Sequence, residues 1–167
     1  IHILNQMGAD IKLKERKIYK GEKIANIHVK SKNNLSGINC SSKLNSSAID
    51  EFLIIFLVAA KSNGISRFRD LGEMNKKESK RLDLGVKFLK SIGIKVDRFK
   101  NNINIYGNPK LILSEKFEVK NFLKDHRIFF LSCITALTLG GKWKINDKDS
   151  INTSFPSFLN ILKNIGA

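Results

Sequence analysis

The feature that most constrains the fold is an internal repeat. DEFLIIFLVAAKSNGIS (50–66) and DHRIFFLSCITALTLGGKW (125–143) each place an acidic residue before an apolar run that ends at a glycine. Downstream, KFLKSIGI (87–94) and NILKNIGA (160–167) each end a helical pattern at a glycine, and HILNQMGADI (2–11) is a third copy of that helix end. The corresponding landmarks of the two longer copies lie 73–76 residues apart. A recurring helix–strand unit predicts an α/β protein with mixed sheets around helices.

Hydrophobic periodicity and the glycines divide the chain into predicted elements. Predicted helices cover 50–62, about 77–92, 125–139 and 155–165. Predicted strands cover 65–69, 94–99, 103–106 and 142–146, and residues 17–32 alternate like a further strand pair. The repeat units therefore run roughly over 50–124 and 125–167.

Composition excludes few function classes. The formal net charge is +15, but the lysines are scattered and most aromatic residues are Phe at core-like positions, so no nucleic-acid partner is predicted. No apolar run is long enough to span a membrane, and no membrane partner is predicted. Cys40 and Cys133 lack metal-ligand spacing and are expected to be reduced, as in a cytoplasmic protein. The chain opens at Ile1 on what reads as the end of a helix, which predicts a fragment.

Charged residues gather at the predicted starts of three helices: Asp50; Lys77, Glu78 and Arg81; Asp125, His126 and Arg127. If these helices run parallel, their N-terminal ends form one rim, and helix N-termini attract anions. Two arginines, a lysine and several carboxylates on such a rim suit an anionic substrate and proton transfer. Arg127 is electrostatically misplaced beside the positive end of a helix dipole, which favours a ligand's negative charge near it.

Glu78 lies four residues before Leu82, on the predicted buried face of its helix, where a partly desolvated carboxylate suits a general acid. The alternative is that these are ordinary solvated helix starts, with Asp50 and Asp125 as N-caps. The sequence has no P-loop, no dinucleotide fingerprint, no nucleophile elbow and no His-Glu-x-x-His motif. It therefore predicts no cofactor, no metal and no covalent nucleophile.

Six motifs in order resemble the C-terminal part of the 5-enolpyruvylshikimate 3-phosphate synthase family. They are MGADI (7–11), IDEF (49–52), KKESKRL (76–82), DHR (125–127), TSFPSFL (153–159) and IGA (165–167). The resemblance implies that residues 1–167 form the C-terminal part of one enolpyruvyl transferase domain. It also implies a second domain outside this chain, without which the fragment is expected to be inactive.

The resemblance implies transfer of the enolpyruvyl group from phosphoenolpyruvate to the 5-hydroxyl of shikimate 3-phosphate, with release of phosphate. By this resemblance Asp50 is the base near the attacking hydroxyl, Lys77 lies close to that hydroxyl, and Glu78 handles protons at the methylene. Arg81 and Arg127 bind phosphoenolpyruvate, and Asp125 and His126 support Arg127. The family implies small-molecule substrates, no cofactor, the other domain of the same enzyme as partner, and a monomer when intact.

Two other readings remain open from the sequence. The chain could belong to the related enzyme that acts on UDP-N-acetylglucosamine, or it could be a basic binding module with degenerate catalytic residues. The motif before Arg81 also departs from the usual family pattern Arg-Val-Lys-Glu-Ser-Asp-Arg, because Asn75 and Lys76 replace its first two residues and Lys80 replaces its Asp. Lys80 places a cation where an acid could have held Arg81.

Overall fold

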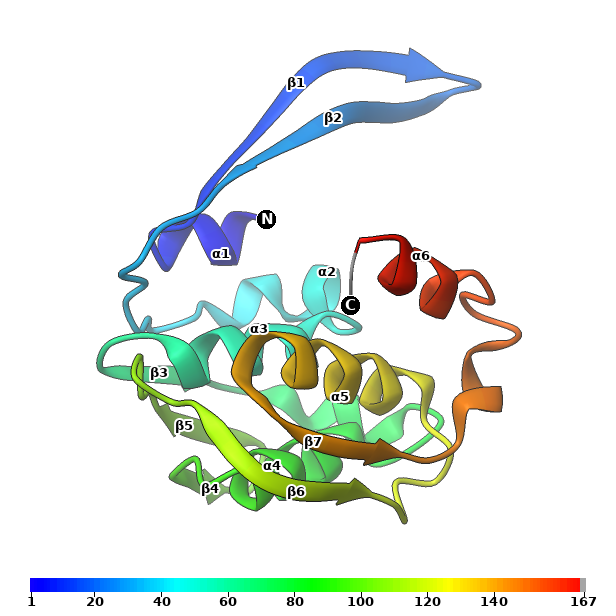
Figure 1. Cartoon of the computed structure of the whole chain (residues 1–167). Helices are drawn as coiled ribbons and strands as arrows, with labels where there is room; N and C mark the ends of the chain where they lie inside the picture. The colour runs from blue at the N-terminus through cyan, green and yellow to red at the C-terminus, as the bar shows by residue number, and fades with distance from the viewer. Residues whose placement is uncertain (166–167) are drawn as a thin grey trace.

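Helix α3 (Phe52–Lys61) lies at the centre of the structure, a computed structural model that describes residues 1–165 (Figure 1). Its buried residues occupy nearly every side of the helix: Phe52, Leu53, Ile55, Phe56, Leu57, Ala59 and Ala60. A helix that is apolar all round has to be enclosed by other elements. Helices α4 (Arg81–Ser91) and α5 (His126–Leu139) both pack against α3 and provide much of that enclosure.

A three-stranded antiparallel sheet in the order β3-β5-β4 also packs on α3. Its strands are β3 (Ile65–Phe68), β4 (Val96–Phe99) and β5 (Asn102–Tyr106). The ring of Phe68 lies 5.9 Å from that of Phe52 and 5.1 Å from that of Phe56. Each buried Phe contributes roughly 1.5–3 kcal/mol, so this cluster fixes the sheet against the helix. The predicted strand at 65–69 and the predicted hairpin at 94–106 are confirmed.

Residues 35–40 extend this sheet beyond β3. An isolated parallel bridge joins Asn39 to Arg67. Gly37 lies so close to β3 that a Cβ atom added to it would come within 2.5 Å of the Ile65 carbonyl oxygen. The sheet therefore has both parallel and antiparallel neighbours, and the predicted α/β class with mixed sheets is confirmed.

Strands β6 (Leu113–Val119) and β7 (Gly140–Ile145) form a separate parallel pair that α5 connects. Trp143 of β7 stacks on Phe117 of β6 with ring centroids 4.6 Å apart, and on Phe88 of α4 at 6.2 Å. These contacts tie the pair to α4. The predicted strand at 142–146 corresponds to β7. The sequence pattern did not predict β6, because its charged residues hide the alternation and its partner strand lies beyond a whole helix.

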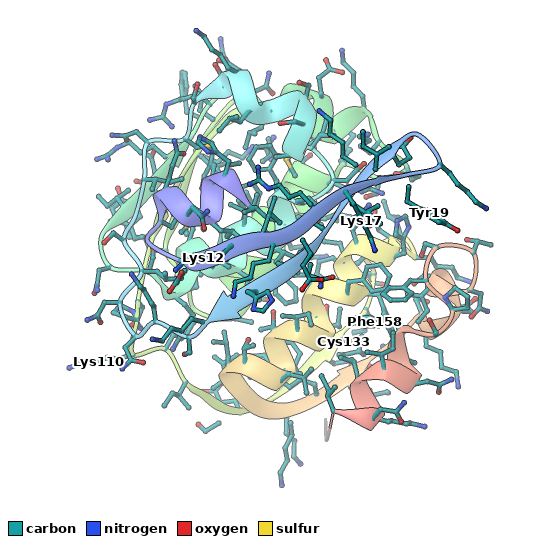
Figure 2. The ribbon with its side chains drawn as sticks, turned by 90° about the horizontal axis from the view of Figure 1, so that it is seen from above. Lys12, Lys17, Tyr19, Lys110, Cys133 and Phe158 are labelled. Carbon is teal, nitrogen blue, oxygen red and sulfur yellow. The ribbon has the colours of Figure 1, made fainter. Side chains whose placement is uncertain are left out.

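The N-terminal part is a short helix, α1 (His2–Gln6), followed by a long hairpin of β1 (Asp10–Tyr19) and β2 (Glu22–Lys30). The hairpin confirms a strand pair in this region, but β1 begins at Asp10, seven residues before the predicted range of 17–32. Figures 1 and 2 show it extending over the helices as a ribbon apart from the other sheets, with Lys12, Lys17 and Tyr19 on it. Ile27 is 60% exposed, and Leu13 lies opposite it in the register, so apolar side chains on one face meet solvent.

Short elements complete the chain: η1 (Ser42–Leu44), α2 (Asn45–Ala48), η2 (Leu71–Lys76), η3 (Lys148–Ile151) and α6 (Phe158–Asn164). A second small core holds α6 against α5 through Phe129, Cys133, Ile151 and Phe158. Among the residues that the structure describes, none of the helices combines the length and the apolar character needed to cross a bilayer.

The predicted helix at about 77–92 begins too early by four residues, because α4 starts at Arg81. The Oδ1 atom of Asn75 accepts hydrogen bonds from the backbone N–H groups of Leu82 (3.0 Å) and Asp83 (3.3 Å). The first free amides of α4 are thus satisfied by a residue that precedes the helix, and the segment 77–80 lies outside it. Asn75, a departure from the family motif, is in this chain the residue that caps α4.

The predicted N-cap role of Asp50 is wrong. Helix α3 begins at Phe52, and Glu51 is its N-cap without a side-chain capping hydrogen bond. Asp50 lies in the turn before it, where its carboxylate is free to reach other segments. The predicted helix at 155–165 is α6, which begins at Phe158, and its predicted stop at Gly166 lies outside the described residues.

We predict that the β1–β2 hairpin opens far more readily than the β3-β5-β4 sheet. A two-stranded ribbon without a packed face is marginally stable in water, whereas the sheet is fixed by Phe52, Phe56 and Phe68. Amide hydrogen exchange of the 167-residue chain should show amides of β2 exchanging at least about tenfold faster than those of β5. Equal protection in β2 and β5 would contradict the prediction.

Candidate active site

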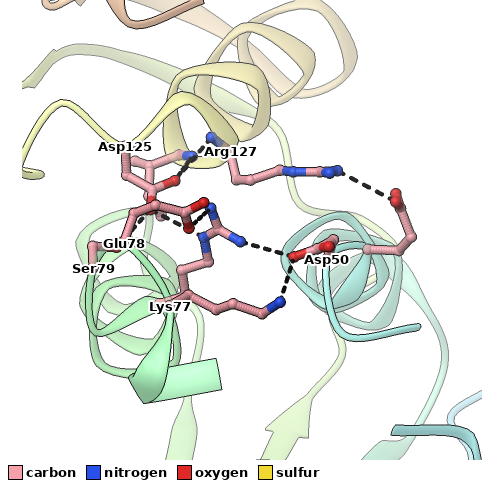
Figure 3. A network of polar contacts seen from close by, with 9 residues as sticks. Asp50, Lys77, Glu78, Ser79, Asp125 and Arg127 are labelled. Carbon is pink, nitrogen blue, oxygen red and sulfur yellow. Dashed lines mark hydrogen bonds and ion pairs between the residues drawn. The ribbon is translucent and has the colours of Figure 1, made fainter. Parts of the chain in front are cut away.

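The three segments that carry the predicted charges meet at the guanidinium group of Arg81 (Figure 3). Its side chain is only 3% exposed. Arg81 donates from Nε to Asp125 Oδ2 at 3.0 Å, from Nη1 to Asp50 Oδ1 at 2.9 Å and from Nη2 to Glu78 Oε2 at 2.5 Å. The first residue of α4 is thereby joined to the turn before α3 and to the start of α5. The expectation that the predicted helix starts share one rim is confirmed.

Asp125 is the buried centre of this network, with a side chain that is 0% exposed. Its Oδ2 also accepts from the Ser79 hydroxyl at 2.6 Å, and its Oδ1 caps α5 by accepting from the backbone N–H groups of Arg127 (2.9 Å) and Ile128 (3.3 Å). Burial raises the pKa of Asp125, but the hydrogen bonds from Ser79 and Arg81 and the charge of Arg81 outweigh it and lower the pKa below its usual 3.8. The carboxylate is therefore ionised at neutral pH.

Asp50, Lys77 and Glu78 form the solvent-facing side of the network. Lys77 Nζ lies 3.5 Å from Asp50 Oδ1, the same oxygen that Arg81 contacts. Glu78 is 67% exposed, so the expectation of a desolvated carboxylate on a buried helix face is wrong. The physical reason is that α4 begins after Glu78, which removes helical spacing as a guide to its direction. The residue of this motif that is buried beside Arg81 is Ser79, which sequence reasoning did not single out.

Arg127 projects from the first turn of α5 toward Glu51, and Nη1 lies 3.3 Å from Glu51 Oε1. The Nε atom of Arg127 is buried and has no hydrogen-bond partner among the described residues. A buried donor without an acceptor is costly and calls for an explanation. Glu51 was not among the predicted site residues. The signal that could have identified it is its position next to Asp50, at the start of a helix.

The expectation that Asp125 and His126 orient the side chain of Arg127 is wrong. Asp125 contacts Arg127 only by accepting a hydrogen bond from the Arg127 backbone N–H at Oδ1. Its other oxygen, Oδ2, accepts from Arg81 and Ser79. The ring of His126 lies edge-on to Phe130, with centroids 6.0 Å apart. The acid that contacts the Arg127 guanidinium is Glu51. The reason is geometric, because a carboxylate that caps a helix points along its axis and not toward a side chain of the first turn.

A cavity of about 770 Å³ opens beside Lys77, between α2, η2 and the start of α3. Its lining is mixed: it combines the polar residues Ser42, Lys43, Asn45, Ser46, Asp70, Glu73, Lys76 and Lys77 with an apolar wall of Ile49, Phe52, Leu71 and Met74. Because Lys77 also pairs with Asp50, the cavity and the arginine network are neighbours. The arrangement places a cavity of mixed polar and apolar lining, large enough for a small molecule, next to acids and fixed cations.

No group of three or more His, Cys, Asp or Glu side chains that could hold a metal ion occurs within residues 1–165. Cys40 and Cys133 are free and buried, as predicted. Burial raises the pKa of Cys133 to about 11 and also raises that of Cys40, so both are protonated thiols at neutral pH.

Comparison with known proteins decides the family. The sequence pattern of EPSP synthase (3-phosphoshikimate 1-carboxyvinyltransferase) matches residues 1–162. The chain belongs to the EPSP synthase family. The resemblance found in the sequence motifs is therefore confirmed.

Relatives share the whole length of this chain at moderate identity. A 3-phosphoshikimate 1-carboxyvinyltransferase from Thermodesulfovibrio yellowstonii is 32% identical over 163 residues, which cover 98% of this chain and 37% of the relative. One from Clostridium tetani is 34% identical over 163 residues, which cover 98% of this chain and 36% of the relative. The chain thus spans about 37% of the length of the curated relatives it matches.

Solved structures agree on the fold. An EPSP synthase from Acinetobacter baumannii superposes with a TM-score of 0.85 at 30% identity, over 98% of this chain and 37% of that one. The enolpyruvyl transferase NikO from Streptomyces tendae superposes with a TM-score of 0.62 at 14% identity. The superposition covers 99% of this chain and 34% of NikO. At that identity the second likeness concerns the fold alone.

We predict that Asp125→Asn destabilises the chain by about 3–5 kcal/mol at pH 7, because it removes the one fully buried carboxylate among the three that pair with the buried Arg81 charge. The amide oxygen of Asn can still cap α5. The measured loss of stability therefore reports the removal of the negative charge and not the loss of the helix cap. The pKa of Asp125 is lowered in the folded state, so its stabilisation is present above the usual pKa of 3.8 and is lost as the pH falls through the folded value. Denaturant unfolding of both proteins between pH 7 and 3 should show the difference shrinking at acidic pH. A difference that is constant with pH would contradict this assignment.

Proposed function

We propose that the complete protein transfers the enolpyruvyl group of phosphoenolpyruvate to the 5-hydroxyl of shikimate 3-phosphate, and that this chain supplies one side of the active site. Membership of the EPSP synthase family supports the reaction. The observation that carries the assignment to these residues is the network around Arg81, in which a buried arginine is held by acids from three segments on one rim. The remaining contacts come from the part of the enzyme that this chain does not cover.

Arg81 and Arg127 bind phosphoenolpyruvate in this proposal. Guanidinium groups suit carboxylate and phosphate because their N–H groups form a fixed planar fork. Arg81 is preorganised by Asp125, so little entropy is lost when it binds a ligand. Arg127 has a buried Nε without an acceptor among the described residues, and an anionic ligand would supply one.

In this proposal Asp50 and Glu78 carry out the proton transfers, and Lys77 supports Asp50. Protonation at C3 of phosphoenolpyruvate by Glu78 leaves a cationic C2, and the 5-hydroxyl oxygen then forms a bond to C2 while its proton passes to Asp50. The C2–O bond to phosphate breaks next, and the leaving phosphate oxygen takes the proton that Asp50 holds. A proton then leaves C3 to Glu78, and the products are the enolpyruvyl ether and inorganic phosphate. Acid, base and fixed cations of this kind are what the chemistry requires. Lys77 Nζ, 3.5 Å from Asp50 Oδ1, positions the Asp50 carboxylate beside the attacking hydroxyl.

The cavity beside Lys77 accepts part of the hydroxyl-bearing substrate. Its volume of about 770 Å³ and its lining of polar side chains around an apolar wall suit a small molecule with polar groups, and Lys77 connects it to Asp50. The relatives named 3-phosphoshikimate 1-carboxyvinyltransferase favour shikimate 3-phosphate over a UDP-amino sugar. A monomeric state and a cytoplasmic location of the complete enzyme remain predictions from the family resemblance.

We expect Glu78→Gln to lower kcat of the complete protein by roughly 10²–10⁴-fold, because the amide keeps the shape of Glu78 but transfers no proton at a useful rate. The KM for phosphoenolpyruvate should change little. Steady-state phosphate release measures both constants. Glu118→Gln is the matched control, since Glu118 on β6 is also paired with cations: Lys120, just after β6, and Lys144 on β7. A Glu78→Gln enzyme with wild-type kcat would remove Glu78 from the mechanism.

Arg127→Ala should instead raise the KM for phosphoenolpyruvate, at a cost of roughly 1.5–3 kcal/mol in binding, because a charge-assisted contact is lost. The control is Arg98→Ala. The side chain of Arg98 is 29% exposed and that of Arg127 30%, and each is paired with one carboxylate, Asp83 for Arg98 and Glu51 for Arg127. If Arg127 were only a solvated residue at the start of α5, its removal would relieve an unfavourable dipole contact and leave the kinetics unchanged. That outcome would contradict the site assignment.

A further inference from the structure

The two adjacent acids Asp50 and Glu51 hold the two arginines that come from different helices. Asp50 contacts Arg81 of α4 at 2.9 Å, and Glu51 contacts Arg127 of α5 at 3.3 Å. Two neighbouring negative groups thus bridge two cationic side chains. A ligand with two anionic groups, such as a carboxylate and a phosphate, would make the same pattern of contacts.

The Glu51–Arg127 contact is the weaker of the two. Glu51 is 62% exposed, and a pair between half-exposed side chains contributes at most about 1 kcal/mol. Its single contact also leaves the buried Nε of Arg127 without an acceptor among the described residues. Glu51 therefore satisfies Arg127 incompletely, and its carboxylate can be released to water at little cost.

We propose that Glu51 is an internal competitor for Arg127, which lowers the affinity of the site for anions until a carboxylate or phosphate ligand displaces it. The inference rests on the proposed function, because it takes Arg127 as a ligand contact. In the free protein Glu51 neutralises the arginine charge at the rim. On binding, the ligand takes over Nη1 and supplies the acceptor that Nε lacks, while Glu51 turns into solvent.

The direction in which anion binding changes when Glu51 is removed distinguishes competition from a supporting role of Glu51. If Glu51 held Arg127 in the binding position, its removal would weaken anion binding. If Glu51 competes, its removal strengthens binding. Glu51 makes no side-chain capping hydrogen bond at α3, so Gln and Ala substitutions leave the local helix start intact.

The test measures the KM for phosphoenolpyruvate and the inhibition constant of inorganic phosphate in the complete protein. Glu51→Gln removes the charge, and Glu51→Ala removes the contact. Since about 1.4 kcal/mol corresponds to a tenfold change, the at most ~1 kcal/mol of this pair predicts that both constants fall by up to about fivefold in Glu51→Ala and less in Glu51→Gln.

The control for general charge effects is Glu115→Gln, because Glu115 lies beside Gly141, just past the end of α5 opposite to Arg127. It should leave both constants unchanged. In an Arg127→Ala background the Glu51 substitutions should also have no effect, which isolates the pairwise interaction. Binding that is unchanged or weaker in both Glu51 variants would overturn the inference. If Arg127→Ala itself leaves the KM unchanged, the proposed function fails as well.

Discussion

The charge of Asp125 is buried, and four donors from two parts of the chain keep it there. The Ser79 hydroxyl and Arg81 Nε bind one oxygen, and two backbone N–H groups at the start of α5 bind the other. A buried carboxylate is tolerated only when its lone pairs accept hydrogen bonds. Moving these donors away from Asp125 would therefore lower the free energy of unfolding by a large amount. The start of α5 and the start of α4 are consequently locked together, and the rest of the rim is built on that junction.

The rim divides into a rigid part and an exchangeable part. Arg81 and Asp125 are buried, and their pairing fixes where two helices begin. Glu78 and Glu51 are about two-thirds exposed, and their pairs with arginine are open to water and to ligands. Buried pairs are costly to break, whereas exposed pairs are worth little. The proposed anion site needs both, because its cations must be held in place yet remain accessible.

Much of the fold could be predicted from local patterns. Hydrophobic periodicity, glycines that end helices and N-terminal capping are local signals. They predict the hairpin at the N-terminal end, the three-stranded sheet and the helix that Asp125 caps. The errors occurred where a distant residue intervened. Asn75 caps α4 from outside and moves its start to Arg81, which turned the predicted buried position of Glu78 into an exposed one. β6 was missed because its partner lies beyond α5.

The sequence by itself determined which charged residues stand at or shortly before the helix starts, and that Asp125 caps its helix, because a cap is a hydrogen bond to a backbone group two or three residues away. Only the tertiary structure decided which acid meets which arginine. Arg81 meets Asp50 and Asp125 at sequence separations of 31 and 44, and Arg127 meets Glu51 at 76. Pairings at such distances depend on how α3, α4 and α5 pack, since apolar packing sets the positions of the helix ends and the charges then pair with whichever groups lie within reach.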